Sequence, residues 1–185
     1  MSRLIRPRSV LVTGASSGLG RALALAFAAR AQASPARLRL WLTGRDAGRL
    51  AETAAAAAEF GAEVATATLD LSLRTGVQEW VLACDAAEPL DVVVANAGRS
   101  AGIGAGPESA EQVRMLIETN IFGVVNTVLP AAACMRTRKH GRIVILSSLA
   151  GRLPFPRLRA TRRPRRSCAA GACRFGLTCL RMVSG

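Results

Sequence analysis

The feature that most constrains this chain is a regular alternation of short apolar runs with longer helical segments. Five runs predict β-strands, and the β-branched first run and the valine-rich fourth run are typical of strands buried on both faces of a sheet. The strands are expected at residues 9–13, 38–43, 64–69, 90–95 and 142–146. Helices are expected at residues 18–33, 46–60, 73–87 and 111–138. This alternation implies right-handed crossovers, so we expect an α/β fold with a doubly wound parallel sheet.

Positive charge is concentrated in the last part of the sequence. The 185-residue chain has a formal net charge of +13, and residues 152–185 hold 9 of its 25 Lys and Arg residues but none of its 12 Asp and Glu residues. We therefore predict a folded domain over residues 1–151 and an irregular, arginine-rich tail over residues 152–185. A basic arm for nucleic acid is the alternative for this tail. Because only one aromatic residue, Phe155, interleaves its first arginines and no binding module is recognisable, we expect no specific nucleic-acid partner.

The remaining composition limits the kinds of site and the compartment. Five cysteines without a C-x-x-C pair and a single histidine argue against a disulfide framework and a zinc site, so no metal is expected. The basic start of the chain lacks the apolar region of a signal peptide, and no apolar stretch approaches the roughly 20 residues of a membrane-spanning helix. We therefore expect a cytoplasmic protein without a membrane partner.

A glycine-rich turn joins the first strand to the first helix. It reads Thr-Gly-Ala-Ser-Ser-Gly-Leu-Gly over residues 13–20. Glycines at this place let the backbone approach a pyrophosphate at a helix N-terminus, and an ordinary glycine turn is the alternative. The spacing resembles that of the classical short-chain dehydrogenase/reductases, whose NAD(P)-binding domain has a Rossmann-type fold. The resemblance implies that the cofactor is bound by Gly14, Ser16, Ser17, Gly18, Leu19 and Gly20.

The end of the second strand indicates which dinucleotide is bound. An acidic residue there suits the ribose 2′-hydroxyl of NAD, whereas a basic residue suits the 2′-phosphate of NADP. Gly44 occupies the acidic position in this sequence, and Arg45 follows it. We therefore expect NADP rather than NAD as the cofactor. The alternative is that Arg45 is a solvated residue at the start of a helix.

Further motifs of the family follow in the family's order. Asp70-Leu71, after the third strand, is similar to the pair that contacts adenine, although Asp70 could instead cap the next helix. Asn96-Ala97-Gly98, after the fourth strand, matches the turn that stabilises the sheet and lies along the cofactor, although any strand-ending turn could use Asn-x-Gly. The resemblance therefore implies that all five residues belong to the cofactor site.

Two residues match the catalytic pattern of the family. Asn120 is similar to the helical asparagine that holds a water in the proton relay; a polar residue on a helix face is the alternative. Ser148, which has the S-x-x-G spacing after the fifth strand, is similar to the serine that hydrogen-bonds a substrate carbonyl or hydroxyl. Together these motifs imply an NADP-dependent oxidoreductase that transfers hydride between NADP(H) and a small carbonyl or secondary alcohol substrate.

The family pattern breaks after Ser148. The family's Tyr-x-x-x-Lys pair, whose tyrosine is the general acid or base, is expected at positions that hold Thr161 and Arg165, and the sequence contains no tyrosine. We hypothesise that the reading frame changes near Ala160 and truncates the chain, which sequencing of the coding DNA from the codon of Phe155 tests. We then expect a Rossmann-type sheet that is incomplete at its C-terminal edge, an incomplete family homo-oligomer interface, and little or no turnover. A non-catalytic dinucleotide-binding or interaction protein is the alternative.

Overall fold

The described residues form one six-stranded sheet with the strand order β3-β2-β1-β4-β5-β6. The computed structural model describes residues 7–33, 37–100, 109–147 and 177–181, the last of these by backbone only. The strands are β1 (Ser9–Thr13), β2 (Arg39–Gly44), β3 (Glu63–Thr68), β4 (Val92–Ala95), β5 (Arg142–Leu146) and β6 (Leu177–Arg181). The helices are α1 (Gly18–Gln32), α2 (Ala47–Ala58), α3 (Arg74–Ala87), α4 (Ala110–Ile117) and α5 (Gly123–Thr137), with the π-helical turn η1 (Glu118–Phe122) before α5. Strands β1 to β5 are parallel, which confirms the expected doubly wound α/β fold.

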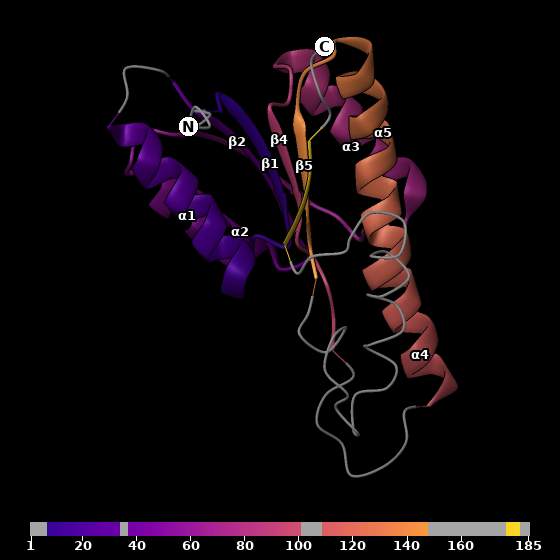
Figure 1. The fold of residues 1–185 in the computed structure, drawn as a ribbon. Coiled ribbons are helices and arrows are strands. Elements are labelled where there is room, and N and C mark those ends of the chain that lie inside the picture. The colour runs from indigo at the N-terminus through magenta and orange to yellow at the C-terminus, as the bar shows by residue number, and fades with distance from the viewer. Residues whose placement is uncertain (1–6, 34–36, 101–108, 148–176, 182–185) are drawn as a thin grey trace.

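Helices cover both faces of the sheet. In Figure 1, α1 and α2 lie on one face, whereas α3 and α5 lie on the other. Side chains of the central strand β1 alternate between the two hydrophobic cores that result. Val10 and Val12 pack with residues of α1 and α2, while Leu11 packs with residues of α3 and α5. Strands β1 and β4 are buried along their whole lengths, as is typical of central strands in a parallel sheet.

The predicted and observed elements agree best where turn chemistry defines their ends. Strands β1 and β5 begin and end where they were predicted. Asp46 caps α2, because its Oδ1 accepts a hydrogen bond from the backbone N–H of Arg49 at 3.0 Å. Gly61 follows α2 with a φ of +80°, a conformation that favours glycine after a helix. The other strands are displaced slightly at their ends.

The long helix expected over residues 111–138 is interrupted by η1. Here the backbone N–H of Gly123 bonds to the carbonyl oxygen of Glu118, five residues earlier, which is the π-helical pattern. Asn120 lies within this turn and is buried. On the neighbouring turn, a Cβ on Gly123 would lie 3.1 Å from the Cβ of Leu71, so the helix comes close to the loop after β3. The π-helical turn thus lies against the carboxyl end of the sheet.

Among the described residues, one helical segment is long and apolar enough to cross a membrane by length and composition alone. This segment is Ala110–Thr137, whose most apolar window has a mean hydropathy of 1.3. The structure therefore differs from the expectation that no stretch of the chain meets this criterion. The physical reason is that one face of the segment packs in the core, where Ala131 and Met135 are fully buried, while 39% of the window as a whole is buried. Core helices pass the same test, so the segment is weak evidence for a membrane.

The tail contributes the edge strand β6. Its backbone pairs antiparallel with β5, with Leu177 opposite Leu146 and Arg181 opposite Arg142. The structure differs here from the predicted irregular tail. The reason is that β5 would otherwise present unpaired N–H and C=O groups, and pairing with such an edge does not require an alternating side-chain pattern. The rest of the tail, residues 152–176 and 182–185, lies outside the described residues.

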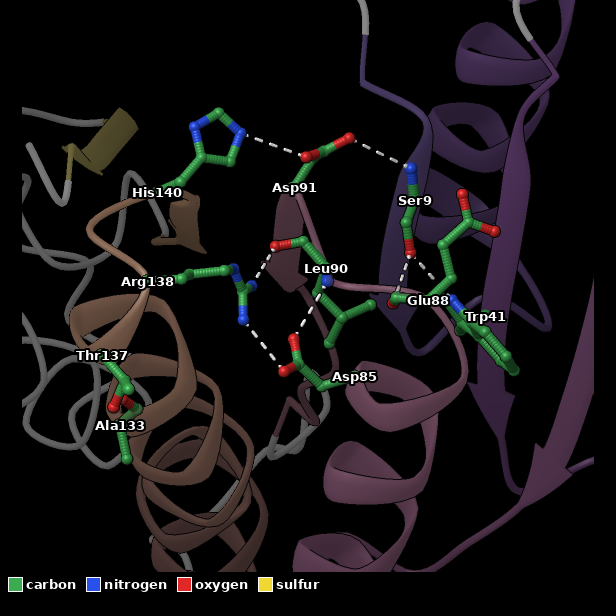
Figure 2. A network of polar contacts seen from close by, with 10 residues as sticks. All are labelled: Ser9, Trp41, Asp85, Glu88, Leu90, Asp91, Ala133, Thr137, Arg138 and His140. Carbon is green, nitrogen blue, oxygen red and sulfur yellow. Dashed lines mark hydrogen bonds and ion pairs between the residues drawn. The ribbon is translucent and has the colours of Figure 1, made fainter. Parts of the chain in front are cut away.

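A network of hydrogen bonds and an ion pair connects helices α3 and α5 to the amino ends of β1 and β4 (Figure 2). Arg138, which follows α5, donates to Oδ2 of Asp85 at 2.9 Å and to the carbonyl oxygen of Leu90 at 2.6 Å. The Asp85 carboxylate also accepts a hydrogen bond from the backbone N–H of Leu90 at 2.9 Å. Next to it, Oδ2 of Asp91 accepts the backbone N–H of Ser9 at 3.3 Å. The network joins α3 and α5 to the sheet, at the opposite end from the strand ends where a ligand is expected.

Candidate cofactor-binding site

A cleft of about 450 Å³ opens at the carboxyl ends of the parallel strands. The loops after β1, β2, β3 and β4 contribute to it, which is where doubly wound sheets bind their ligands. Most of the predicted cofactor residues line this cleft: Gly14, Ser16, Ser17, Leu19, Arg45, Leu71, Asn96, Ala97 and Gly98. The predicted residues Gly18, Gly20 and Asp70 are not part of its lining.

The turn after β1 has a conformation and a packing that require glycine. Gly14 has a φ of +69° and Gly18 a φ of +54°, both in the left-handed region. A Cβ on Gly14 would lie 2.8 Å from the Cα of Ala97, and a Cβ on Gly20 would collide with the carbonyl oxygen of Gly14. The missing side chains let β1, α1 and the loop after β4 approach one another, so the backbone itself forms the floor of the cleft.

The N-terminus of α1 faces the cleft without a side-chain cap. Ser17 is the N-cap residue, but its side chain makes no capping hydrogen bond, and the first turn of α1 holds no acidic residue. Ser16, Ser17 and Leu19 line the cleft at this point. Uncapped backbone N–H groups and the positive end of the helix dipole favour an anionic group such as a phosphate here.

Asn96 fixes the glycine turn to the end of β4. Its Nδ2 donates to the carbonyl oxygens of Thr13 and Gly14, at 3.0 and 3.3 Å. In the other direction, the hydroxyl of Thr13 accepts the backbone N–H groups of Asn96 and Ala97, at 3.0 and 3.1 Å. The Asn96 amide is therefore bonded within the protein. Thr13 was not assigned to the site from the sequence, and the signal that could have found it is its place as the first residue of the glycine motif.

The loop after β2 supplies the cationic residue Arg45 to the cleft. Position 44 holds glycine and so presents no acidic side chain, and a Cβ there would meet the hydroxyl of Ser16, which would have to move. Arg45 lines the cleft instead, and it forms no ion pair with any carboxylate of the described residues. The nearby carboxylate of Asp46 caps α2 and lies 3.5 Å from the guanidinium of Arg49, which offsets its charge.

Asp70 stabilises the loop after β3. Its Oδ1 accepts the backbone N–H of Ser72 at 3.0 Å and the hydroxyl of Ser72 at 2.7 Å. The bonds from Ser72, followed by the charges of Arg45 and Arg99, hold the pKa of the Asp70 carboxyl below its ordinary value. Helix α3 begins later, with Leu73 as its N-cap residue and without a side-chain cap. The alternative interpretation that Asp70 caps this helix is therefore wrong.

Asn120, one of the two predicted catalytic residues, clamps the backbone of a cleft loop. Its side chain is buried, its Oδ1 accepts the backbone N–H of Arg99 at 2.7 Å, and its Nδ2 donates to the carbonyl oxygen of Arg99 at 2.9 Å. The sequence could not show this pairing, because the two residues are 21 positions apart. The other predicted catalytic residue, Ser148, lies outside the described residues, as do Thr161 and Arg165.

The cleft also contains two charged residues that were not assigned to it from the sequence. Arg49 lies in the first turn of α2, and Arg99 directly follows the Asn-Ala-Gly turn. The available signal was their position, because each is close in sequence to a residue that was assigned. Among the described residues, no group of three or more His, Cys, Asp or Glu side chains could hold a metal ion.

The sequence profile of the family described as short chain dehydrogenase matches residues 8–160 of the chain. The chain belongs to the short-chain dehydrogenase family. Members of this family are oxidoreductases that bind NAD(P) and act on small molecules. The family assignment confirms the resemblance that the motifs between Thr13 and Ser148 carry.

Individual relatives of this short-chain dehydrogenase agree in sequence and in fold. An uncharacterized oxidoreductase of Myxococcus xanthus is 40% identical over 145 residues, which cover 78% of this chain and 55% of that protein. An NADP-dependent 3-hydroxy acid dehydrogenase of Salmonella typhi is 32% identical over 148 residues, covering 79% of this chain and 56% of the other. The crystal structure of levodione reductase has a TM-score of 0.81 at 25% identity, and the match covers 92% of this chain and 65% of that one. The chain thus spans about half the length of the curated relatives it matches.

Proposed function

We propose that this short-chain dehydrogenase binds NADP(H) in the cleft at the carboxyl ends of its strands. The fit of the residues to a dinucleotide rests first on the glycine turn. Because Gly14 and Gly20 have no room for a Cβ, the backbone can come close to a ligand there. The uncapped N-terminus of α1 then supplies N–H donors for a pyrophosphate. These features support a phosphate-bearing cofactor lying across β1.

The observation that carries the preference for NADP is Arg45 beside Gly44. Recognition of NAD uses a carboxylate on the ribose 2′-hydroxyl, but position 44 holds glycine and offers no carboxylate. A guanidinium, by contrast, binds a phosphate through two parallel N–H donors, and Arg45 faces the cleft without an ion-pair partner among the described residues. The NADP-dependent relative from Salmonella typhi supports the same preference.

We propose that the reaction for which this fold is built is hydride transfer between NADP(H) and a small carbonyl or secondary alcohol. A bound nicotinamide supplies or accepts the hydride. On the protein side, Asn120 holds the loop at Arg99 in place by two hydrogen bonds, and the Ser148 hydroxyl would hydrogen-bond the substrate oxygen. Movement of a proton at that oxygen requires a general acid or base. The resemblance assigns this part to a tyrosine, and Thr161 stands in its place.

The absence of tyrosine leads us to propose that this chain binds NADPH with little or no turnover. A threonine hydroxyl ionises at a much higher pH than a phenol, so it is a poor general acid for a developing alkoxide. Residues 1–185 contain no tyrosine that could act from another position. The same observation favours the second candidate function, a non-catalytic NADPH-binding protein. The two candidates share the cleft and differ only in whether a substrate is turned over.

Calorimetric titration of the purified chain with NADPH and NADH tests the binding proposal. We expect NADPH to bind at least about tenfold more tightly, because that is the effect of roughly 1.4 kcal/mol, less than a charge-assisted Arg–phosphate pair provides. The Arg45→Ala variant should lose this preference with little change in NADH affinity, whereas Arg45→Lys should retain part of it. Equal wild-type affinities for NADH and NADPH would contradict the NADP assignment.

Oxidation of NADPH in the presence of a panel of aldehydes and ketones tests the proposal on turnover. We expect no rate above that of the free cofactor. Rapid turnover by the 185-residue chain would contradict the proposal and would restore the full family function. Tight NADPH binding without turnover would instead support the non-catalytic candidate.

A further inference from the structure

Arg99 and Arg45 flank the glycine turn on its two sides. Strand β1 lies between β2 and β4 in the sheet, Arg45 follows β2, and Arg99 comes four residues after the end of β4. Both side chains line the same cleft as Gly14 and Ser17. The backbones of Arg45 and Arg99 therefore reach one cleft from opposite sides of the glycine turn.

The backbone of Arg99 is held in place, although it belongs to a loop. Both its N–H and its carbonyl oxygen are hydrogen-bonded to the buried side chain of Asn120, at 2.7 and 2.9 Å. The guanidinium takes no part in these bonds. The side chain thus extends from a fixed point on the cleft wall, and its replacement leaves the clamp in place.

The charge of Arg99 is available to a ligand. No carboxylate of the described residues forms an ion pair with it, and the acid in the cleft lining, Asp46, is offset by Arg49. Arg99 and Arg45 both favour the ionised form of Asp70, which places the two cations near the same carboxylate. The cleft that holds the glycine turn therefore carries an excess of positive charge, and a pyrophosphate matches that charge.

We propose that Arg99 is a further cofactor-binding residue, whose guanidinium binds the pyrophosphate of the dinucleotide from the β4 side. The proposal rests on the proposed binding of a dinucleotide in this cleft. It does not depend on the preference for NADP, because NAD and NADP share the pyrophosphate. Arg45 would then bind the 2′-phosphate of NADP, and Arg99 would bind the pyrophosphate, which both cofactors contain.

Four ligands separate these two contributions in calorimetric titrations of the full chain. NADPH, NADH and ADP-ribose contain the pyrophosphate, whereas adenosine 2′-phosphate lacks it. We expect Arg99→Ala to weaken the first three by a common factor of about ten and to leave adenosine 2′-phosphate unchanged, since one charged hydrogen-bonded contact is lost. Arg45→Ala should show the reverse pattern, weakening NADPH and adenosine 2′-phosphate but not NADH.

Matched variants control for charge and folding. Arg99→Lys should retain most of the affinity, and Arg99→Gln should behave like Arg99→Ala, with a melting temperature close to that of the wild type because the Asn120 clamp uses only the backbone. Arg74→Ala removes an exposed arginine at the start of α3, outside the cleft, and should change no affinity. It measures the effect of net charge alone.

Two results would overturn the proposal: an unchanged NADH affinity in Arg99→Ala, or a loss confined to NADPH and adenosine 2′-phosphate. The second result would assign the Arg99 guanidinium to the ribose 2′-phosphate instead of the pyrophosphate. Failure of the proposed function gives different results, which are seen in the wild-type chain. A preference for NADH would refute only the NADP assignment. Binding of none of the four ligands would refute dinucleotide binding itself.

Discussion

Replacement of Arg138 by methionine should destabilise the fold by about 2 kcal/mol, an estimate between the 3–5 kcal/mol of a broken buried pair and the 0–1 kcal/mol of an exposed pair. The structure places the pair between these limits, because the Arg138 side chain is 24% exposed and that of Asp85 is 13% exposed. Methionine keeps the apolar stem but removes the donors to Asp85 and to the carbonyl oxygen of Leu90 (Figure 2). For a chain of this size, that loss corresponds to a melting temperature lower by roughly 4–8 °C.

Thermal and urea unfolding, followed by circular dichroism, measure this effect. Asp85→Asn should lose less than Arg138→Met, because an amide oxygen can still accept the Leu90 N–H, and the double variant should lose less than the sum of the two. Arg136→Met is the matched control, since this arginine is exposed near the same helix end and has no ion pair among the described residues. A melting temperature for Arg138→Met within about 1 °C of that of the Arg136 variant, or strict additivity in the cycle, would refute the reasoning.

Two further predictions concern the glycine turn and the buried thiol. Gly20→Ala should reduce NADPH affinity more than tenfold and destabilise the fold by about 1–3 kcal/mol, since its Cβ meets the carbonyl oxygen of Gly14. The control Gly48→Ala should slightly stabilise the fold, because a Cβ has space at this position in α2. Calorimetry compares the NADPH affinities of the two variants, and urea unfolding compares their stabilities. Burial raises the pKa of the Cys84 thiol from 9.0 to about 12, so the unfolded chain ionises first and the free energy of unfolding should fall as the pH rises from about 9 toward 12. Urea unfolding at several alkaline pH values should show a smaller fall for Cys84→Val, and an identical fall would contradict this assignment.

Most of the sheet could be predicted because its strands are bounded by residues with strong local preferences. Gly14 ends β1, and Asp46 and Gly61 bound α2, each through its own backbone or side-chain chemistry. The π-helical turn at Asn120 could not be predicted, because its residues continue the same helical pattern as α4 and α5. Its cause is tertiary, since the turn buries the amide that binds Arg99.

The candidate site divides in the same way between local and tertiary information. The glycine turn and Arg45 follow from local sequence, because the conformation of Gly14 and the place of Arg45 after β2 depend on their immediate neighbours. The clamp between Asn120 and Arg99 and the packing of Ser16 on Gly44 join segments distant in sequence, so a single sequence holds no signal for them. The catalytic pattern at Ser148 and the reading-frame change near Ala160 stay predictions.

The contacts that shape the cofactor cleft lie in a different part of the sequence from the missing tyrosine, so cofactor binding can be tested separately from turnover. Each contact that shapes the cleft floor, from the Asn96 amide on the glycine turn to the Asn120 amide on Arg99, joins residues that precede Ser148. Both hydrophobic cores beneath the cleft are likewise built from residues of β1 to β5, of α1, α2, α3 and α5, and of the loops between them. The break in the family pattern falls after these contacts. A loss of turnover caused by the missing tyrosine should therefore leave NADPH affinity intact, whereas a loss of the fold would abolish both together.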